Sequence, residues 1–414
     1  MRKCALYIFC LLLPLVWACS KDDNFAPFRP SDGKDVREME RRLPSTETRR
    51  VLIYVSAGYN SLSGYLDQNL ETLLGSKLPV GHYYSADVLL VLARKPVSSG
   101  NYTSPSAPVL FRIYAGSDGA PVRDTLKTWG GEDPICSPEI FADAMNYVRD
   151  RFPAKGYGMI FSSHALGWLP PNYKASDGGL AWTSPRRSLG QDRKGNDGYE
   201  LALDEFAAAL PFRMDYLLID ACLMGCVEVA WQLRGKADVV GFSPTEILAK
   251  GFDYSTLTTH LFAKEPDPVG VCKDYFNQYG PQGDATVTVV DTRKMDALAS
   301  VCKRLFQKYH AQLVSLNPDS VQRYFRPVAT PNCTVLYDLL DILVKAGITA
   351  SEQEELQAAL DQAILYKDTS ERFLSIPINT YSGLSLYLPS AGNATLDAYY
   401  KSHIAWNEAS GLIQ

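Results

Sequence analysis

The stretch 216–231 constrains the fold of this chain more than any other. It begins with the apolar run Tyr-Leu-Leu-Ile and then carries apolar residues at helical spacing. A short, continuous apolar run is typical of a strand that is buried on both faces of a parallel sheet. We therefore expect a buried strand that ends near Asp220 and a helix that begins at Cys222.

Cys222 is a candidate nucleophile because of this predicted position. A thiol at a helix N-terminus lies near unpaired backbone N–H groups and the positive end of the helix dipole, which stabilise the thiolate. Asp220 precedes it by two residues, so an extended backbone would place both side chains on one side. Two alternatives stay open. Cysteine often serves as a small buried hydrophobe, and Cys226 could join Cys222 in redox or metal chemistry, although the spacing is not Cys-x-x-Cys.

Strands alternate with helices along most of the chain. Apolar runs rich in β-branched residues predict buried strands at 50–55, 86–92, 157–163, 237–242 and 286–291. Helices are predicted at 60–74, 137–151 and 199–210, and helices dominate beyond residue 265. This alternation indicates the α/β class, with a parallel sheet that is covered by helices on both faces.

His164 follows the predicted strand 157–163, just as Cys222 follows the strand that ends at Asp220. In open α/β sheets, ligands bind beyond the carboxyl ends of the strands, so we expect both side chains at one edge. An imidazole at that edge can take the proton of the thiol and later protonate a leaving amine. A thiol and an imidazole in this arrangement are the minimal requirement of a cysteine peptidase.

Two motifs strengthen this interpretation. The segment 162–168, Ser-Ser-His-Ala-Leu-Gly-Trp, resembles the His-Gly-x-Gly-Trp signature of the clostripain family of cysteine peptidases. The segment 219–230 closely resembles that family's Asp-Ala-Cys-Leu-Met-x-x-x-Glu-Val-Ala nucleophile motif. The segments 52–60 and 383–389 are similar to weaker family landmarks. The resemblance therefore extends over nearly the whole chain after its first 50 residues.

The resemblance implies a caspase-like fold, an α/β/α sandwich of three layers with a mostly parallel central sheet and a helix-rich C-terminal part. We expect a peptidase core at 50–265 and a helix-rich region at 266–414 that completes the domain. The resemblance also implies a catalytic dyad of His164 and Cys222. The backbone N–H groups of Ala165 and Cys222 are expected to hold the oxyanion. Alanine replaces the usual glycine at 165, and it would be strained if the site required a positive φ.

Family members prefer Arg or Lys before the cut bond, so polypeptides with these residues are the expected substrates. Asp220 can line the binding pocket and pair with the cationic side chain, or it can cap the next helix as a structural acid. Glu246 and Asp253, on the loop after strand 237–242, are further pocket candidates, and the alternative is that both are solvated loop acids.

Clostripain-like enzymes often mature by cutting themselves between the histidine and the cysteine. Four basic residues in that interval are candidate cleavage sites on an expected loop: Arg186, Arg187, Arg193 and Lys194. The resemblance allows Ca²⁺ as a structural ion, although no calcium-binding loop is recognisable from spacing. No cluster has the spacing of a zinc site, and the sequence itself requires no cofactor.

The N-terminus indicates export. Residues 1–18 combine a basic start, a short apolar run and small residues near the end, as signal peptides do. Cys19 follows directly and resembles the lipid-modified cysteine of bacterial lipoproteins, whereas an ordinary cleaved signal is the alternative. The polar stretch 19–49 would then tether the domain to the outer membrane, on its periplasmic or cell-surface side. The net charge of -5 and the lack of a basic stripe argue against a nucleic-acid partner, and we expect a monomer.

Two functions are therefore open for this chain. The first is an exported, lipid-anchored cysteine endopeptidase that cuts after Arg or Lys. The second is a surface lipoprotein that keeps the scaffold, has weak or no catalysis, and binds peptide or glycan.

Overall fold

The computed structural model describes residues 49–80, 86–94, 96–99, 102–171, 188–194, 197–326 and 334–414. Cys19, the predicted signal and the predicted tether up to residue 48 lie outside these residues, as do Arg186 and Arg187.

The strands are β1 Arg50–Ser56, β2 Asp87–Ala93, β3 Pro96–Ser99, β4 Tyr102–Pro105, β5 Val109–Ala115, β6 Pro121–Thr128, β7 Gly156–Ser162, β8 Leu189–Lys194, β9 Asp197–Leu201, β10 Met214–Asp220, β11 Ala237–Phe242, β12 Thr286–Asp291, β13 Leu336–Asp338, β14 Ile364–Thr369, β15 Arg372–Phe373, β16 Ile376–Pro377 and β17 Ser385–Tyr387. The α-helices are α2 Ser63–Leu74, α3 Pro138–Arg151, α4 Leu203–Ala209, α5 Val227–Leu233, α6 Leu257–Leu261, α7 Pro268–Tyr279, α8 Met295–Lys308, α9 His310–Ser315, α10 Leu339–Lys345, α11 Ala350–Ala363, α12 Ala394–His403 and α13 Ala405–Ser410. Short 3-10 helices are η1 Gly280–Gln282, η2 Thr292–Lys294, η3 Pro318–Ser320 and η4 Pro389–Ala391.

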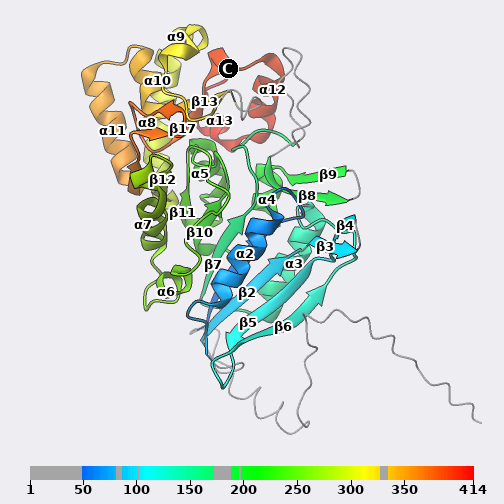
Figure 1. Cartoon of the computed structure of the whole chain (residues 1–414). Coiled ribbons are helices and arrows are strands. Elements are labelled where there is room, and N and C mark those ends of the chain that lie inside the picture. The colour runs from blue at the N-terminus through cyan, green and yellow to red at the C-terminus, as the bar shows by residue number, and fades with distance from the viewer. Residues whose placement is uncertain are drawn as a thin grey trace, which may run out of the picture.

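A nine-stranded sheet forms the centre of the molecule, in the order β14-β12-β11-β10-β7-β1-β2-β5-β6 (Figure 1). Its middle strands, from β11 to β2, pair in parallel with one another. The outer strands β12 and β14 on one side, and β5 and β6 on the other, pair antiparallel. The predicted α/β class with a central, mostly parallel sheet is confirmed.

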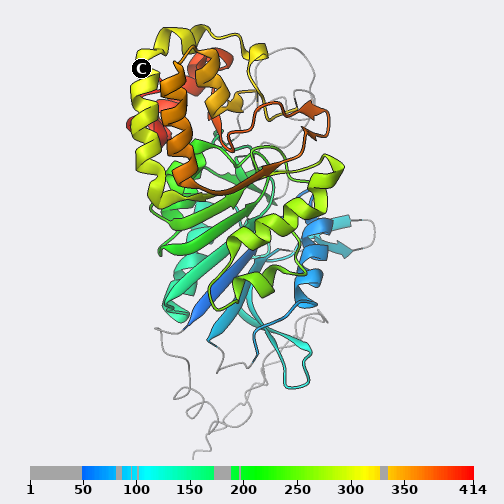
Figure 2. The ribbon, with the colours of Figure 1, turned by 90° about the vertical axis from the view of Figure 1, so that its left-hand side faces the viewer.

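Alternate residues of the buried strands enter two separate cores. In β1, Val51, Ile53 and Val55 face one core, whereas Leu52 and Tyr54 face the other. The first core contains side chains from α3, α4 and α5, and the second contains side chains from α2, α6 and α7. Figure 2 shows α2 and α7 together on one side of the sheet. Helices therefore cover both faces, which explains why these strands are continuously apolar in sequence.

The chain after α7 returns to the same sheet and the same core. β12 and β14 extend the sheet beyond β11, and apolar side chains from α8 and from the last helices join the first core. These helices gather at one end of the molecule, coloured yellow to red in Figures 1 and 2. The small β13–β17 sheet adds Tyr387 to this core.

Several predicted elements are confirmed, and two are not. The helix predicted at 137–151 is present as α3, and the Ser137 hydroxyl accepts a hydrogen bond from Ile140 N at 3.2 Å. The segment 199–210 was predicted to be one helix, but its first residues belong to β9 and only Leu203–Ala209 is helical. The helix predicted to begin at Cys222 begins at Val227.

Candidate active site

Strand register brings His164 and Cys222 to the same edge of the sheet. β7 and β10 are parallel neighbours, with Ser162 opposite Asp220 at their carboxyl ends. Ser163 N donates to the Asp220 carbonyl at 3.3 Å, so the pairing continues one step beyond the strands. His164 lies two residues after Ser162, and Cys222 lies two residues after Asp220. They therefore leave adjacent strands at equivalent positions, as the sequence predicted.

His164 is held by its side chain and by its backbone. The residue is 7% exposed, and its Nε2 lies 2.8 Å from the Ser61 hydroxyl oxygen. Its carbonyl accepts a hydrogen bond from Gly190 N in β8 at 2.9 Å. The imidazole is consequently fixed by two segments that are distant from it in sequence, the loop after β1 and the strand β8.

Cys222 lies in a turn and not at a helix N-terminus. Val227, the first residue of α5, lies five positions after it, and the N-cap position belongs to Cys226. Leu223, which follows it, has a φ of 63°. The prediction that the helix dipole stabilises a Cys222 thiolate is therefore wrong, because that effect falls off within the first turn.

The turn is bound to the loop after β11 and not to its own helix. Leu223 N donates to Thr245 O, and Gly225 N donates to Ser243 O, each at 2.8 Å. A Cβ on Gly225 would lie 2.4 Å from Pro244 N, so only glycine permits this close approach. The partly exposed Cys222 places its Sγ 3.7 Å from the Ile247 carbonyl oxygen, on the same loop.

Ala165 is not strained by the replacement of glycine. Among the described residues other than glycine, only Leu223 and Leu374 have a positive φ. Ala165 forms an antiparallel bridge with Leu189, and the bonds on either side are Leu166 N to Ser188 O and Gly190 N to His164 O. In such a pair the N–H of the middle residue points away from the partner strand. The positive φ of this motif belongs instead to Gly167, at 65°.

Asp220 is a buried carboxylate with several partners. It is 5% exposed, and its Oδ2 accepts hydrogen bonds from Tyr254 Oη at 2.7 Å and Ser162 Oγ at 3.0 Å. A Cβ on Gly251 would lie 2.2 Å from Oδ2, so the loop backbone packs directly against the carboxylate. Burial raises the pKa of Asp220, and the hydrogen bonds from Tyr254, Ser162 and Phe252 N oppose that rise. It does not cap a helix, because α5 begins beyond it.

Glu246 and Asp253 already have partners within the protein. Both carboxylate oxygens of Glu246 bind Arg326, with Oε1 at 2.9 Å from Nε and Oε2 at 2.6 Å from Nη2. The hydrogen bond to Glu246 raises the pKa of the Arg326 guanidinium, and the negative charge of a Cys222 thiolate would add to that rise. Asp253 accepts from Ser255 N at 3.0 Å and from its hydroxyl, in a turn before α6. Glu246 therefore belongs to an ion pair, whereas Asp253 stabilises a turn.

Two of the four predicted cleavage sites lie in a strand and not in a loop. Arg193 and Lys194 belong to β8 and pair with Gly198 and Asp197 of β9. The Arg193 carbonyl also accepts a hydrogen bond from Arg94 at 2.7 Å. Proteases cut extended, accessible backbone, so the hairpin must open before either residue is cut.

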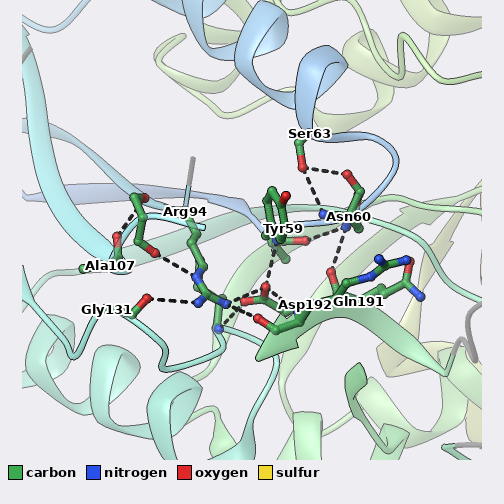
Figure 3. Close-up of polar contacts among 12 residues, drawn as sticks. Tyr59, Asn60, Ser63, Arg94, Ala107, Gly131, Gln191 and Asp192 are labelled. Atoms are coloured by element: carbon green, nitrogen blue, oxygen red, sulfur yellow. Dashed lines mark hydrogen bonds and ion pairs between the residues drawn. The ribbon is translucent and has the colours of Figure 1, made fainter. Parts of the chain in front are cut away.

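A polar network beside His164 was not anticipated. The guanidinium of Arg94 and the carboxylate of Asp192, both fully buried, form an ion pair at 2.8 Å (Figure 3). Asp192 also accepts from the backbone N–H groups of Tyr59, Ile135 and Arg193, at 2.7–2.8 Å. No local sequence pattern indicates this ion pair, because Arg94 and Asp192 are almost 100 positions apart.

A second buried carboxylate, Glu228, lies on the cysteine side. Its Oε1 accepts from Tyr387 N and from Tyr400 Oη, each at 2.8 Å. Trp168, from the histidine motif, packs edge-on against Tyr387 and Tyr400 with ring centroids 5.1 and 4.8 Å away. The glutamate of the nucleophile motif was visible in the sequence, whereas its C-terminal partners were not.

The described residues offer no group of three or more His, Cys, Asp or Glu side chains that could hold a metal ion. Ca²⁺ also binds backbone carbonyl oxygens, so the structural ion that the resemblance allows stays a prediction. Within the same residues, no helix is both long and apolar enough to cross a bilayer.

Comparisons with known proteins agree with this geometry. The structure resembles the inactive zymogen of a C11 protease from Parabacteroides distasonis, with 30% identity, a TM-score of 0.72, and coverage of 89% of this chain and 99% of that one. A secreted C11 cysteine protease from Bacteroides thetaiotaomicron, bound to an irreversible peptide inhibitor, shares the fold at 22% identity and a TM-score of 0.70, with 87% and 98% coverage. A search of curated proteins finds no match. The sequence model of the clostripain family matches residues 16–410, and the chain belongs to this family of cysteine peptidases.

Proposed function

We propose that this protein is a cysteine endopeptidase that cuts polypeptides after Arg or Lys with His164 and Cys222. The register of β7 and β10 is the observation that supports the proposal most, because it delivers an imidazole and a thiol to one edge at equivalent positions. Membership of the clostripain family adds the expected chemistry.

The reaction follows from the positions of these groups. His164 takes the proton of the Cys222 thiol, and the thiolate attacks the carbonyl carbon of the substrate. The oxyanion that forms is held by the backbone N–H groups of Ala165 and Cys222. His164 then protonates the leaving amine, and water, activated by the same imidazole, hydrolyses the thioester.

Asp220 is the proposed recognition group for the basic side chain. It lies two residues before the nucleophile, and its carboxylate has a raised pKa because of burial. A guanidinium or ammonium group beside it would replace lost solvation and favour the charged form. Glu246 is less suited to this role, since Arg326 already binds both of its oxygens.

Hydrolysis of short Arg and Lys reporter peptides tests the proposal. We expect the wild type to cleave both and the Cys222→Ala variant to cleave neither, with an Asp220→Asn variant losing at least 10-fold in kcat/KM. A reporter with Glu in place of the basic residue is the matched substrate control. Absence of cleavage by a folded wild type, before and after a tryptic cut within 172–187, would favour the peptide- or glycan-binding lipoprotein instead.

We further propose that the chain cuts itself after Arg186 or Arg187 and is exported and lipid-anchored through Cys19. The two arginines remain the better candidates because Arg193 and Lys194 are paired in β8. Purified wild type should separate into two fragments, whereas Cys222→Ala should remain one band. Two identical single bands would overturn self-cleavage. Radiolabelled palmitate should enter the wild type and not a Cys19→Ala variant.

A further inference from the structure

We infer that Ser61 is a positioning residue for His164, whose hydroxyl accepts the Nε2 proton and so assigns Nδ1 to proton exchange with Cys222. This inference rests on the proposed function. The observation behind it is the 2.8 Å contact between Ser61 Oγ and His164 Nε2.

The tautomer of the imidazole decides whether it can act as a base toward the thiol. A neutral imidazole carries one proton, so a hydrogen bond donated from Nε2 leaves Nδ1 as the acceptor. When the thiol transfers its proton to Nδ1, both ring nitrogens become donors, and the Ser61 oxygen stabilises the cation that results. An acceptor at Nε2 therefore favours the imidazolium–thiolate pair.

Asn60 fixes the loop that carries Ser61. Its side-chain amide donates to Gln191 O at 2.8 Å, and its amide oxygen accepts from Leu62 N at 2.7 Å. Its backbone N–H donates to Ser63 Oγ at 2.9 Å, at the start of α2. The contacts of Asn60 with Gln191 and Ser63 are drawn in Figure 3. Together with the Leu62 contact, they hold the residues on both sides of Ser61.

The strand β8 holds this loop and the histidine at the same time. Gly190 N donates to His164 O, Gln191 O accepts from Asn60, and the Asp192 carboxylate accepts from Tyr59 N. Three consecutive residues of one strand thus fix both partners of the Ser61–His164 contact.

The approach of the loop to β8 requires a glycine at position 58. Gly58 has a φ of 107°, and a Cβ there would lie 2.0 Å from Gln191 O. The buried Arg94–Asp192 pair then secures β8, because Arg94 also donates to the carbonyls of Ser106 and Gly131 at 2.9 and 3.2 Å (Figure 3). The contact to His164 is consequently supported by a rigid frame and not by a mobile side chain alone.

The ionisable groups on the surrounding elements keep their own partners when Ser61 is changed. Asp192 is paired with Arg94, Asp220 with Tyr254, and Glu246 with Arg326. A changed titration of Cys222 in a Ser61 variant can therefore be assigned to the lost hydroxyl.

The pH dependence of Cys222 alkylation by iodoacetamide tests the inference without a substrate. Peptide mapping by mass spectrometry separates Cys222 from the buried cysteines 136, 226, 272 and 302. In the wild type we expect reaction well below the ordinary thiol pKa of about 8.5. Ser61→Ala should raise the midpoint by about one pH unit and lower kcat roughly 10-fold with little change in KM. Ser61→Thr, which keeps a hydroxyl, should restore both.

Two controls separate the outcomes. Ser300→Ala removes an exposed helical hydroxyl whose partner is Asp296 O, and it should leave the midpoint unchanged. An unshifted midpoint in a folded Ser61→Ala protein, together with a shift in His164→Ala, would overturn the role of Ser61 and leave the dyad standing. A wild-type midpoint near 8.5 that does not move in His164→Ala would overturn the dyad and the inference with it.

Discussion

Two buried carboxylates flank the candidate site, and they are stabilised in opposite ways. Asp192, on the histidine side, meets the guanidinium of Arg94 and three backbone N–H groups. Glu228, on the cysteine side, places Oε1 on two donors, whereas Oε2 has no hydrogen-bond partner within the described part of the chain. Burial raises the pKa of both. Arg94 opposes the rise at Asp192, but no cation does so at Glu228.

The difference indicates that the ionisation of the buried acid changes near neutral pH on the cysteine side and not on the histidine side. Without a cation, burial raises the pKa of Glu228 to about 7, although the hydrogen bonds from Tyr387 N and Tyr400 oppose the rise. Asp192 is neutralised by a permanent positive charge, since arginine does not lose its proton in proteins. The histidine side is therefore a fixed frame, whereas the packing between α5 and the C-terminal helices includes a group that titrates near neutrality.

The largest expected effect follows from removal of the cation on the histidine side. Arg94→Ala leaves the Asp192 carboxylate buried without its counter-charge, which should cost about 3–5 kcal/mol of unfolding free energy. Urea unfolding at pH 7 measures this loss. The double variant Arg94→Ala, Asp192→Ala should recover part of it, because no charge is then left uncompensated. Equal losses in the single and double variants would contradict the account of the pair.

The next effect concerns the pH dependence of stability on the cysteine side. The folded-state pKa of Glu228 is about 7 and its ordinary value is 4.5, so the folded protein binds the extra proton between these limits. Its contribution to stability is complete below pH 4.5 and is lost as pH rises to about 7, which amounts to about 3 kcal/mol. The unfolding free energy of the wild type minus that of Glu228→Gln should fall across this interval. A flat difference would show that Glu228 stays charged in the folded protein.

The smallest expected effect follows from removal of the Tyr400 hydroxyl that donates to Glu228. Tyr400→Phe removes one of the two donors on Oε1 and should cost about 1–2 kcal/mol, since it leaves a buried acceptor less satisfied. The same change should raise the apparent pKa of Glu228 further. Tyr399→Phe, whose hydroxyl lacks a hydrogen-bond partner among the described residues, is the matched control. Equal effects of the two variants would argue against the contact.

The sequence predicted the central strands well because their burial on both faces leaves a clear pattern. Runs such as Val51–Val55 are apolar at every position, and β1, β7, β10 and β11 lie where expected. The carboxyl-edge rule then predicted the edge of the sheet at which His164 and Cys222 both lie. These inferences needed only local pattern and a general rule of parallel sheets.

The sequence could not predict contacts that depend on distant segments. The start of α5 was placed at Cys222, because nothing local shows that Leu223 and Gly225 bind the loop after β11. Ser61 is an ordinary serine in sequence, and only the folded loop brings it to His164. The pair of Glu246 with Arg326, 80 residues apart, is hidden for the same reason.

The central claim, that Cys222 is the nucleophile activated by His164, is tested most directly by covalent labelling. A short peptide that carries an electrophilic group directly after Arg should add once to the wild type, at Cys222 by peptide mapping. His164→Ala should label far more slowly, and Cys222→Ala should not label. A folded wild type that stays unlabelled at Cys222, before and after a tryptic cut within 172–187, would contradict the claim.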